Sequence, residues 1–152
     1  MDIFEHDADE REQERKTRQI VSIWTMFRTS LSQLLDSYNA GPNGEIHPAK
    51  MISPSDESIV IDCPLGAHPE KRFVLLAVTV RAQVVKGRLQ IGCEIEKWTK
   101  SVLPTNMPTT ESRRKMIFNL EENGDFLLHG VQQLTVYEAA ELLLGTALLK
   151  RD

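Results

Sequence analysis

The strongest constraint on the fold is a pair of β-rich runs between Arg72 and Trp98, separated by Lys86-Gly87. A two-residue turn at Lys86-Gly87 pairs Val85 with Arg88 and fixes the register of the whole hairpin. In that register, one face carries only apolar side chains: Leu76, Val78, Val80, Ala82 and Val84 beside Leu89, Ile91, Cys93 and Ile95. This face is predicted to be core, because a one-residue slip would expose all of these side chains.

The opposite face of the hairpin is polar near the turn and apolar at its far end, where Phe73, Leu75, Ala77 and Trp98 gather. Left uncovered, such a cluster is a candidate interface with Trp98 as its anchor. Layer packing favours the other arrangement, a sheet packed between two helices, one of which covers this end. If both helices share the uniform face, the outer end is left bare and the interface interpretation is favoured.

A long N-terminal helix is predicted from about Asp7 to Tyr38, a stretch without Gly or Pro. Its apolar stripe recurs at spacings of three and four and comprises Ile20, Trp24, Phe27, Leu31, Leu34 and Tyr38, widened by Ile23 and Leu35. The preceding part has no apolar face and carries acid-before-base pairs four residues apart, such as Glu12–Lys16. Residues 1–19 are therefore predicted to be a charged helical arm that projects, and residues 20–152 a single domain.

A shorter helix is predicted at the C-terminus, where Thr135 and Glu138 match a capping box. It runs to about Lys150, and its buried side is expected to hold Ala139, Ala140, Leu143, Leu144, Ala147 and Leu148. Further strands are expected at 58–63, 114–120 and 126–129, and loops at 45–58 and 99–112. The predicted fold class is α+β: an antiparallel sheet of about five strands with a long N-terminal helix and a short C-terminal helix.

Composition limits the class of partner. A formal net charge of −4 and a pI near 5.6 argue against a phosphate backbone or an anionic membrane as partner. Nucleic-acid binding through Arg113, Arg114 and Lys115 is a weaker alternative. The two cysteines are not in a CxxC pair, the N-terminus lacks a signal-peptide core, and no apolar run suits a membrane span, so a cytoplasmic location is expected.

Glu94 and Glu96 are the most suggestive polar pair, because residues two apart on a strand share a face. Paired carboxylates can bind a metal or divide acid and base roles. The favoured reading is a solvated strand face on which Arg81 pairs diagonally with Glu94. On the same face, Gly92 in mid-strand indicates a bulge or a close approach by another backbone or ring.

Other chemistry finds little support in the residue spacings. His6, His47, His68 and His129 have no metal-ligand spacing, and no phosphate-binding glycine motif occurs. A Cys63–His68 nucleophile pair oriented by Asp62 would need spatial adjacency that nothing in the sequence requires. We therefore predict no catalytic residue, no metal ligand and no cofactor, and the question of enzymatic activity stays open.

The leading hypothesis is a non-catalytic protein-interaction module, adaptor or chaperone-like and homodimeric, that binds a protein partner or itself. Its predicted binding residues are Phe73, Leu75, Gly92, Glu94, Glu96 and Trp98. The alternative is a small ligand-binding domain or enzyme whose pocket between sheet and helix uses Glu94 and Glu96, with His129 nearby. The outline is similar, in architecture only, to secretion-chaperone-like dimeric α+β adaptors, although this chain has a predicted loop where they place a middle helix.

Overall fold

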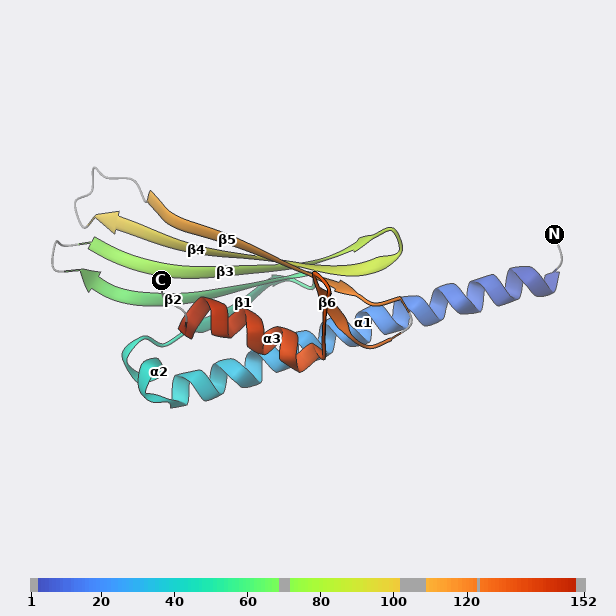
Figure 1. The fold of residues 1–152 in the computed structure, drawn as a ribbon, viewed down its shortest axis with the longest axis horizontal. Helices are drawn as coiled ribbons and strands as arrows, with labels where there is room; N and C mark the ends of the chain where they lie inside the picture. Colours follow the sequence, from blue (N-terminus) through green and yellow to red (C-terminus); the bar gives the residue numbers. More distant parts are fainter. Residues whose placement is uncertain (1–2, 69–71, 102–108, 123, 150–152) are drawn as a thin grey trace.

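A computed structural model describes residues 3–68, 72–101, 109–122 and 124–149, and the side chains of 8–65, 74–98, 113–122 and 124–148. The chain forms one antiparallel sheet whose strands follow sequence order, with helices before and after it (Figure 1). The helices are α1 (Ile3–Ala40), α2 (Pro42–Ile46), α3 (Val136–Leu144) and the π-helical η1 (Gly145–Leu149). The strands are β1 (Lys50–Ser55), β2 (Ser58–His68), β3 (Arg72–Val85), β4 (Arg88–Ser101), β5 (Thr109–Leu120), β6 (Leu127–His129) and β7 (Gln132–Leu134).

The β3–β4 hairpin has the predicted register. Val85 pairs with Arg88, and the ladder continues without a shift to Arg72 and Ser101. Lys86 and Gly87 both have positive φ, 53° and 76°, as a two-residue turn that matches the strand twist requires. The predicted α+β class with its long first and short last helix is confirmed, although the described sheet has seven strands rather than about five.

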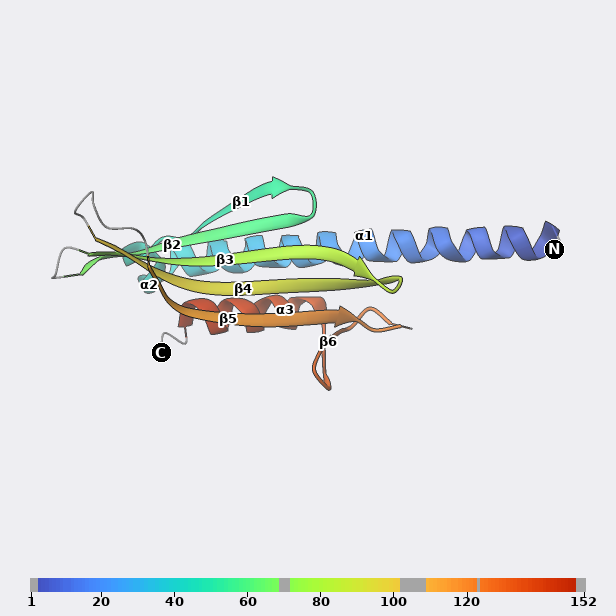
Figure 2. The same cartoon turned by 90° about the horizontal axis from the view of Figure 1, so that it is seen from above.

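The core lies on one face of the sheet, which we call the inner face, and both α1 and α3 pack there (Figures 1 and 2). The expected arrangement, with the sheet between the two helices, is therefore not the one found. Two features allow it: the apolar inner rows continue from β2 to β5, and Ala139 and Ala140 on α3 let α1 approach closely. The fully buried strand residues of the core include Ile59, Ile61, Val78, Val80, Leu89, Ile91, Phe118 and Leu127.

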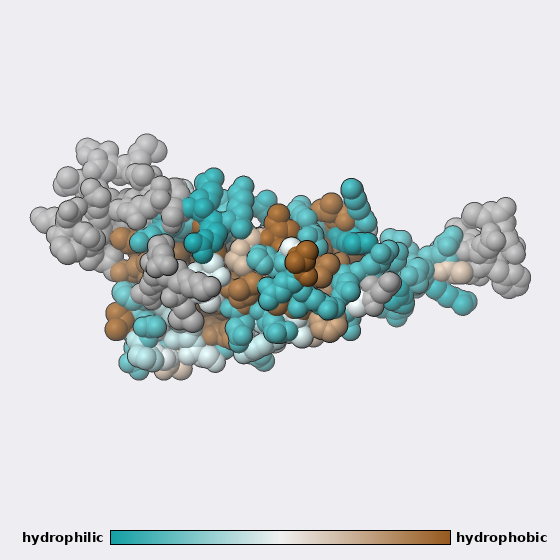
Figure 3. Space-filling view, in the orientation of Figure 1, coloured by the Kyte–Doolittle hydropathy of each residue, from teal (hydrophilic) through white to brown (hydrophobic). Residues whose placement is uncertain are grey.

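Helix α1 is fixed across the inner face by its apolar stripe and by polar contacts. Ile23, Trp24, Phe27, Leu31 and Leu35 are buried. The Trp24 Nε1 donates to the Asp56 carbonyl at 2.7 Å, and the Gln19 Nε2 to the Gly124 carbonyl at 2.9 Å. Residues 8–18 are exposed, and this part of α1 extends beyond the sheet with a mostly hydrophilic surface (Figures 1 and 3).

The prediction of a loop over 45–58 is wrong in part, because this segment includes the end of α2 and all of β1. Strand β1 lies at the sheet edge and carries Pro54, and most of its residues are exposed, so it has no alternating pattern to detect. Helix α2 packs tightly on the end of α1: a Cβ on Gly44 would clash with the Tyr38 carbonyl oxygen, so only glycine fits there.

The prediction of a loop over 99–112 is also wrong in part. Strand β4 continues to Ser101, and β5 begins at Thr109. Strand β2 likewise continues beyond Pro64, with a register shift between Pro64 and Ala67 that accommodates the proline. In each case, pairing with a long neighbouring strand extends a segment whose own residues favour a turn. Within the described residues, no helix is long and apolar enough to cross a membrane.

Candidate functional site

The outer face of the sheet lies opposite both helices (Figure 1). Strand alternation places Leu75, Glu94, Glu96 and Trp98 on it, together with the glycine position 92. Leu75 and Trp98 are directly paired across β3 and β4, and both are half-buried. The backbone of Phe73 pairs with that of Lys100 in the same ladder, and the Phe73 side chain is not among those that the structure describes. The structure therefore brings Leu75 and Trp98 together on a face over which neither α1 nor α3 packs.

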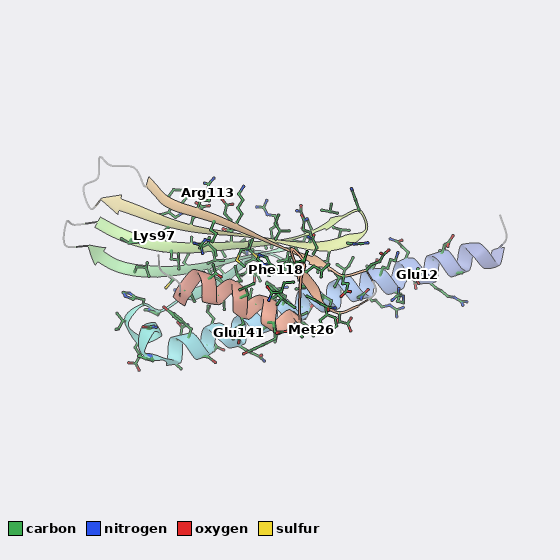
Figure 4. The ribbon with its side chains drawn as sticks, viewed as in Figure 1. Glu12, Met26, Lys97, Arg113, Phe118 and Glu141 are labelled. Atoms are coloured by element: carbon green, nitrogen blue, oxygen red, sulfur yellow. The ribbon has the colours of Figure 1, made fainter. Side chains whose placement is uncertain are left out.

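The acidic pair on this face is held by Arg113 rather than by the expected Arg81. The Arg113 Nε lies 2.9 Å from Glu94 Oε1, and its Nη2 lies 3.7 Å from Glu96 Oε2. Register explains the choice, because Glu96 pairs directly with Arg113 across β4 and β5. Figure 4 places Arg113 on the side of the sheet away from the helices. Sequence reasoning missed this contact because the register of β5 depends on the length of the connection after β4.

The Glu96 carboxylate is incompletely satisfied. Its Oε2 is buried and accepts no hydrogen bond from the described residues, and the whole side chain is only 16% exposed. A buried acceptor without a donor costs free energy, and the long contact with Arg113 offsets only part of it. Among the described residues, the Glu96 Oε2 therefore depends on its long contact with Arg113.

Gly92 lies beside this cluster without the bulge that was expected. It pairs with Arg81 and with Ile117 in unshifted ladders, and the register shift of β4 against β5 lies instead between Lys97 and Trp98. A Cβ on Gly92 would meet only the Arg81 carbonyl oxygen, at an ordinary 3.9 Å. Neither backbone geometry nor crowding within the described chain requires glycine here, so a larger residue would fit at this outer-face position.

The other candidate sites are not brought together. His129 packs its ring 5.5 Å from that of Phe118, a buried inner-face residue, whereas Glu94 and Glu96 are on the outer face. Strand alternation likewise places Asp62 and Cys63 on opposite faces, and the His68 side chain lies outside the described side chains. Among the described residues, no group of three His, Cys, Asp or Glu could hold a metal ion.

The two thiols occupy buried structural positions. Cys63 Sγ lies 3.3 Å from the His47 carbonyl oxygen and donates to it. Burial raises the pKa of the Cys93 thiol to about 12, so this thiol is protonated and unreactive at neutral pH. Both thiols are buried and neither is in a disulfide, so neither has the environment of a nucleophile.

The basic triplet is divided between the two faces. Arg113 and Lys115 follow the outer-face rows, opposite Glu96 and Glu94, whereas Arg114 pairs with the inner-face residue Ile95. All three side chains are exposed, but Arg113 is already engaged by carboxylates. This division does not form the continuous basic surface that phosphate backbones require.

A further feature, which no sequence motif indicated, is a hollow of about 470 Å³ where the end of α1 meets α2, α3 and η1. We call it the C-terminal hollow. It is lined by Leu34, Ser37, Tyr38, Gly41, Pro42, Asn43, Glu141, Leu144, Gly145 and Leu148. A second hollow of about 330 Å³ shares Glu141 and Gly145 with it. Compared with protein-family models, curated proteins and solved structures, the chain matches none.

Proposed function

We propose that the protein is a non-catalytic protein-interaction module of the cytoplasm that forms a homodimer through the outer face of its sheet. The observation that carries this proposal is the packing of both helices on the inner face. It leaves Leu75 and Trp98 half-buried on a face that neither α1 nor α3 covers. Partly exposed aromatic and aliphatic side chains of this kind are the usual anchors of protein interfaces.

The charges on the outer face support a second copy of the chain as the partner. Glu94 and Glu96 form an acidic row on β4, and Arg113 and Lys115 form a basic row beside it on β5. A two-fold axis that runs along the strands between these rows places the acidic row of one copy opposite the basic row of the other. A two-fold interface must be self-complementary in this way.

Gly92 fits the same proposal. Because this outer-face position carries no side chain, it gives room for a side chain of the second copy, although a larger residue would fit the strand equally well. The pocket alternative receives no comparable support, because His129 does not share a face with the two glutamates.

The experiment is to compare the mass in solution of the wild type with that of Trp98→Asp, by light scattering over a concentration series. A buried charge at the anchor of the interface removes association, so a wild-type dimer and a mutant monomer are expected. Tyr137→Asp is the matched control, because Tyr137 is an aromatic residue 47% exposed on α3, away from the outer face. It should leave the mass unchanged.

A second variant covers the case in which Trp98→Asp unfolds, as judged by circular dichroism. Gly92→Val adds a side chain at an outer-face position where an added Cβ has only one ordinary contact. Valine favours strands more than glycine does, so the thermal stability of the subunit should stay the same or rise while association weakens. A monomeric wild type at the highest concentration, or a Gly92→Val dimer as tight as the wild type, contradicts the proposal.

A further inference from the structure

The C-terminal hollow has the size and lining of a small-molecule site. Its volume of about 470 Å³ falls within the range of ~300–1,000 Å³ that is usual for ligand pockets. Apolar side chains from α1 and from α3 with η1 face it, chiefly Leu34, Leu144 and Leu148. Ser37, Asn43 and Glu141 are the polar side chains among them. Such a combination of an apolar body and a few polar groups is typical of sites that bind and orient a small ligand.

The walls of the hollow are fixed by contacts that point away from it. The Tyr38 hydroxyl donates to the His47 carbonyl at 3.0 Å. Asn39 uses both ends of its amide on Ala49, donating at 2.9 Å to the carbonyl and accepting at 2.8 Å from the N–H. Gly44 packs directly against the end of α1. A ligand would therefore enter a preformed space, with little ordering of the protein on binding.

The presence of glycine at position 145 points most directly to a ligand. Its φ of −61° is ordinary right-handed helix, and an added Cβ would meet no described atom within 4 Å. Glycine weakens a helix relative to alanine, so neither the backbone nor the packing explains its presence. A larger side chain would instead project toward the hollows that Gly145 lines.

The charge around the hollow indicates the sign of the ligand. Glu141 projects from α3 (Figure 4) and lines both hollows, and Glu138 lines the second. None of the described lining residues of either hollow is Lys, Arg or His. The ring of Tyr38, which also lines the main hollow, presents an aromatic surface that attracts cations. An anionic ligand would find no counter-charge among these residues.

We infer that the C-terminal hollow binds a small organic cation, an amine that carries an apolar chain or ring. The apolar part occupies the space between Leu34, Leu144 and Leu148, and the ammonium group lies beside the Glu141 carboxylate. This inference does not depend on the proposed function, because the hollow is on the helical side of the molecule and the proposed dimer surface is on the outer face of the sheet.

The test is a titration of the full chain near neutral pH with octylamine, octanol and octanoate, followed by amide NMR shifts. These probes share one chain and differ in the charge of the head group. Octylamine should bind about fivefold more tightly than octanol, the factor given by one solvent-exposed ion pair of about 1 kcal/mol, and octanoate most weakly. Shifts should concentrate on residues that line the hollow. Equal affinities, or no saturable shifts, overturn the inference.

Two variants separate the charge from the space. Glu141→Gln should reduce octylamine affinity to that of octanol and leave octanol binding unchanged. Gly145→Phe should abolish binding of both probes, while the thermal stability stays equal to or above that of the wild type. Gly92→Val is the matched control, since it enlarges a glycine on the outer face and should bind octylamine like the wild type.

Contrary results with the variants are equally clear. Unchanged octylamine affinity in Gly145→Phe means that the amine binds elsewhere, and it overturns the inference. A loss of self-association in Gly145→Phe also overturns the inference, because it would mean that a side chain of another protein molecule occupies the hollow. Loss of dimerisation in Trp98→Asp with normal octylamine binding leaves the inference intact.

Discussion

Two adjacent residues of β5 express the difference between the faces of the sheet. Ile117 on the outer face is 48% exposed, whereas Phe118 on the inner face is 0% exposed and contacts the rings of Phe27 and His129. Both residues belong to the same ladder with β4. The backbone pairing is therefore shared, and the packing of two helices on one side makes the difference. Burial concentrates stability on the inner face and leaves the outer face available for association.

The largest expected effect comes from comparing two single variants, Phe118→Ala and Ile117→Ala. Phe118→Ala should lower the free energy of unfolding by about 3–5 kcal/mol, because it removes a fully buried ring and leaves a cavity. Ile117→Ala should cost about 1 kcal/mol or less, because much of its surface already contacts water. Urea unfolding at equal protein concentration measures both. Similar losses for the two variants would mean that a second layer buries the outer face in solution.

The next largest effect is the pH dependence of the free energy of unfolding, which tests the burial of Cys93 on the inner face. Burial raises the pKa of the Cys93 thiol from 9.0 to about 12, so the folded state holds its proton where the unfolded state loses it. The stabilising contribution is therefore complete below pH 9 and is lost between pH 9 and 12. In this range the free energy of unfolding falls with pH, with a slope that approaches about 1.4 kcal/mol per pH unit. The slope should be present in the wild type and reduced in Cys93→Ala, measured by chemical unfolding from pH 8 to 10.5.

A smaller effect is expected where α3 begins. The Thr135 hydroxyl accepts from the Glu138 N–H at 3.1 Å, and the Glu138 carboxylate accepts from the Thr135 N–H at 3.0 Å. The backbone hydrogen bond from Thr135 lowers the pKa of Glu138. Thr135→Ala should cost about 1 kcal/mol of unfolding free energy, and Thr135→Ser should restore most of it, because serine also caps helices. A thermal scan of the three proteins checks this order.

The smallest effect is expected on the outer face. Arg113→Ala removes the ion pairs with Glu94 and Glu96 and should lower the free energy of unfolding of the subunit by about 1 kcal/mol or less. The loss should shrink as salt is raised, because these charges are partly exposed. In dimerisation assays, the same variant should have a larger effect than in unfolding assays. A loss of several kcal/mol in the monomer would show that this cluster stabilises the fold itself.

Local sequence signals predicted several elements correctly. The two-residue turn at Lys86-Gly87 set the β3–β4 register, and the capping box at Thr135 set the start of α3. The stripe of α1 and the buried side of the C-terminal helix were also correct, since Ile23 and Phe27 in α1, Leu143 in α3 and Ala147 in η1 are all buried. In each case the controlling interactions lie within one element or one hairpin, so a short window of sequence contains them.

Elements that depend on a neighbour were missed or misplaced. Strand β1 and the extensions of β2, β4 and β5 exist because a long strand lies beside them, and their own residues carry Pro or a mixed pattern. The same limit applied to the candidate site: the sequence placed Leu75, Trp98, Glu94 and Glu96 on one face, but Arg113 depended on the β5 register. The C-terminal hollow needed four helical segments to meet, and no single sequence motif indicates such a meeting.

The sequence by itself determined the α+β class, the register of the central hairpin and the apolar character of the inner face. Periodicity and turn chemistry are local and strong enough to specify these features. Only the tertiary structure decided that both helices pack on that one face, because both possible arrangements bury an amphipathic helix against a sheet. That choice depends on the combined width and fit of all layers, and it determines whether the outer face is core or surface.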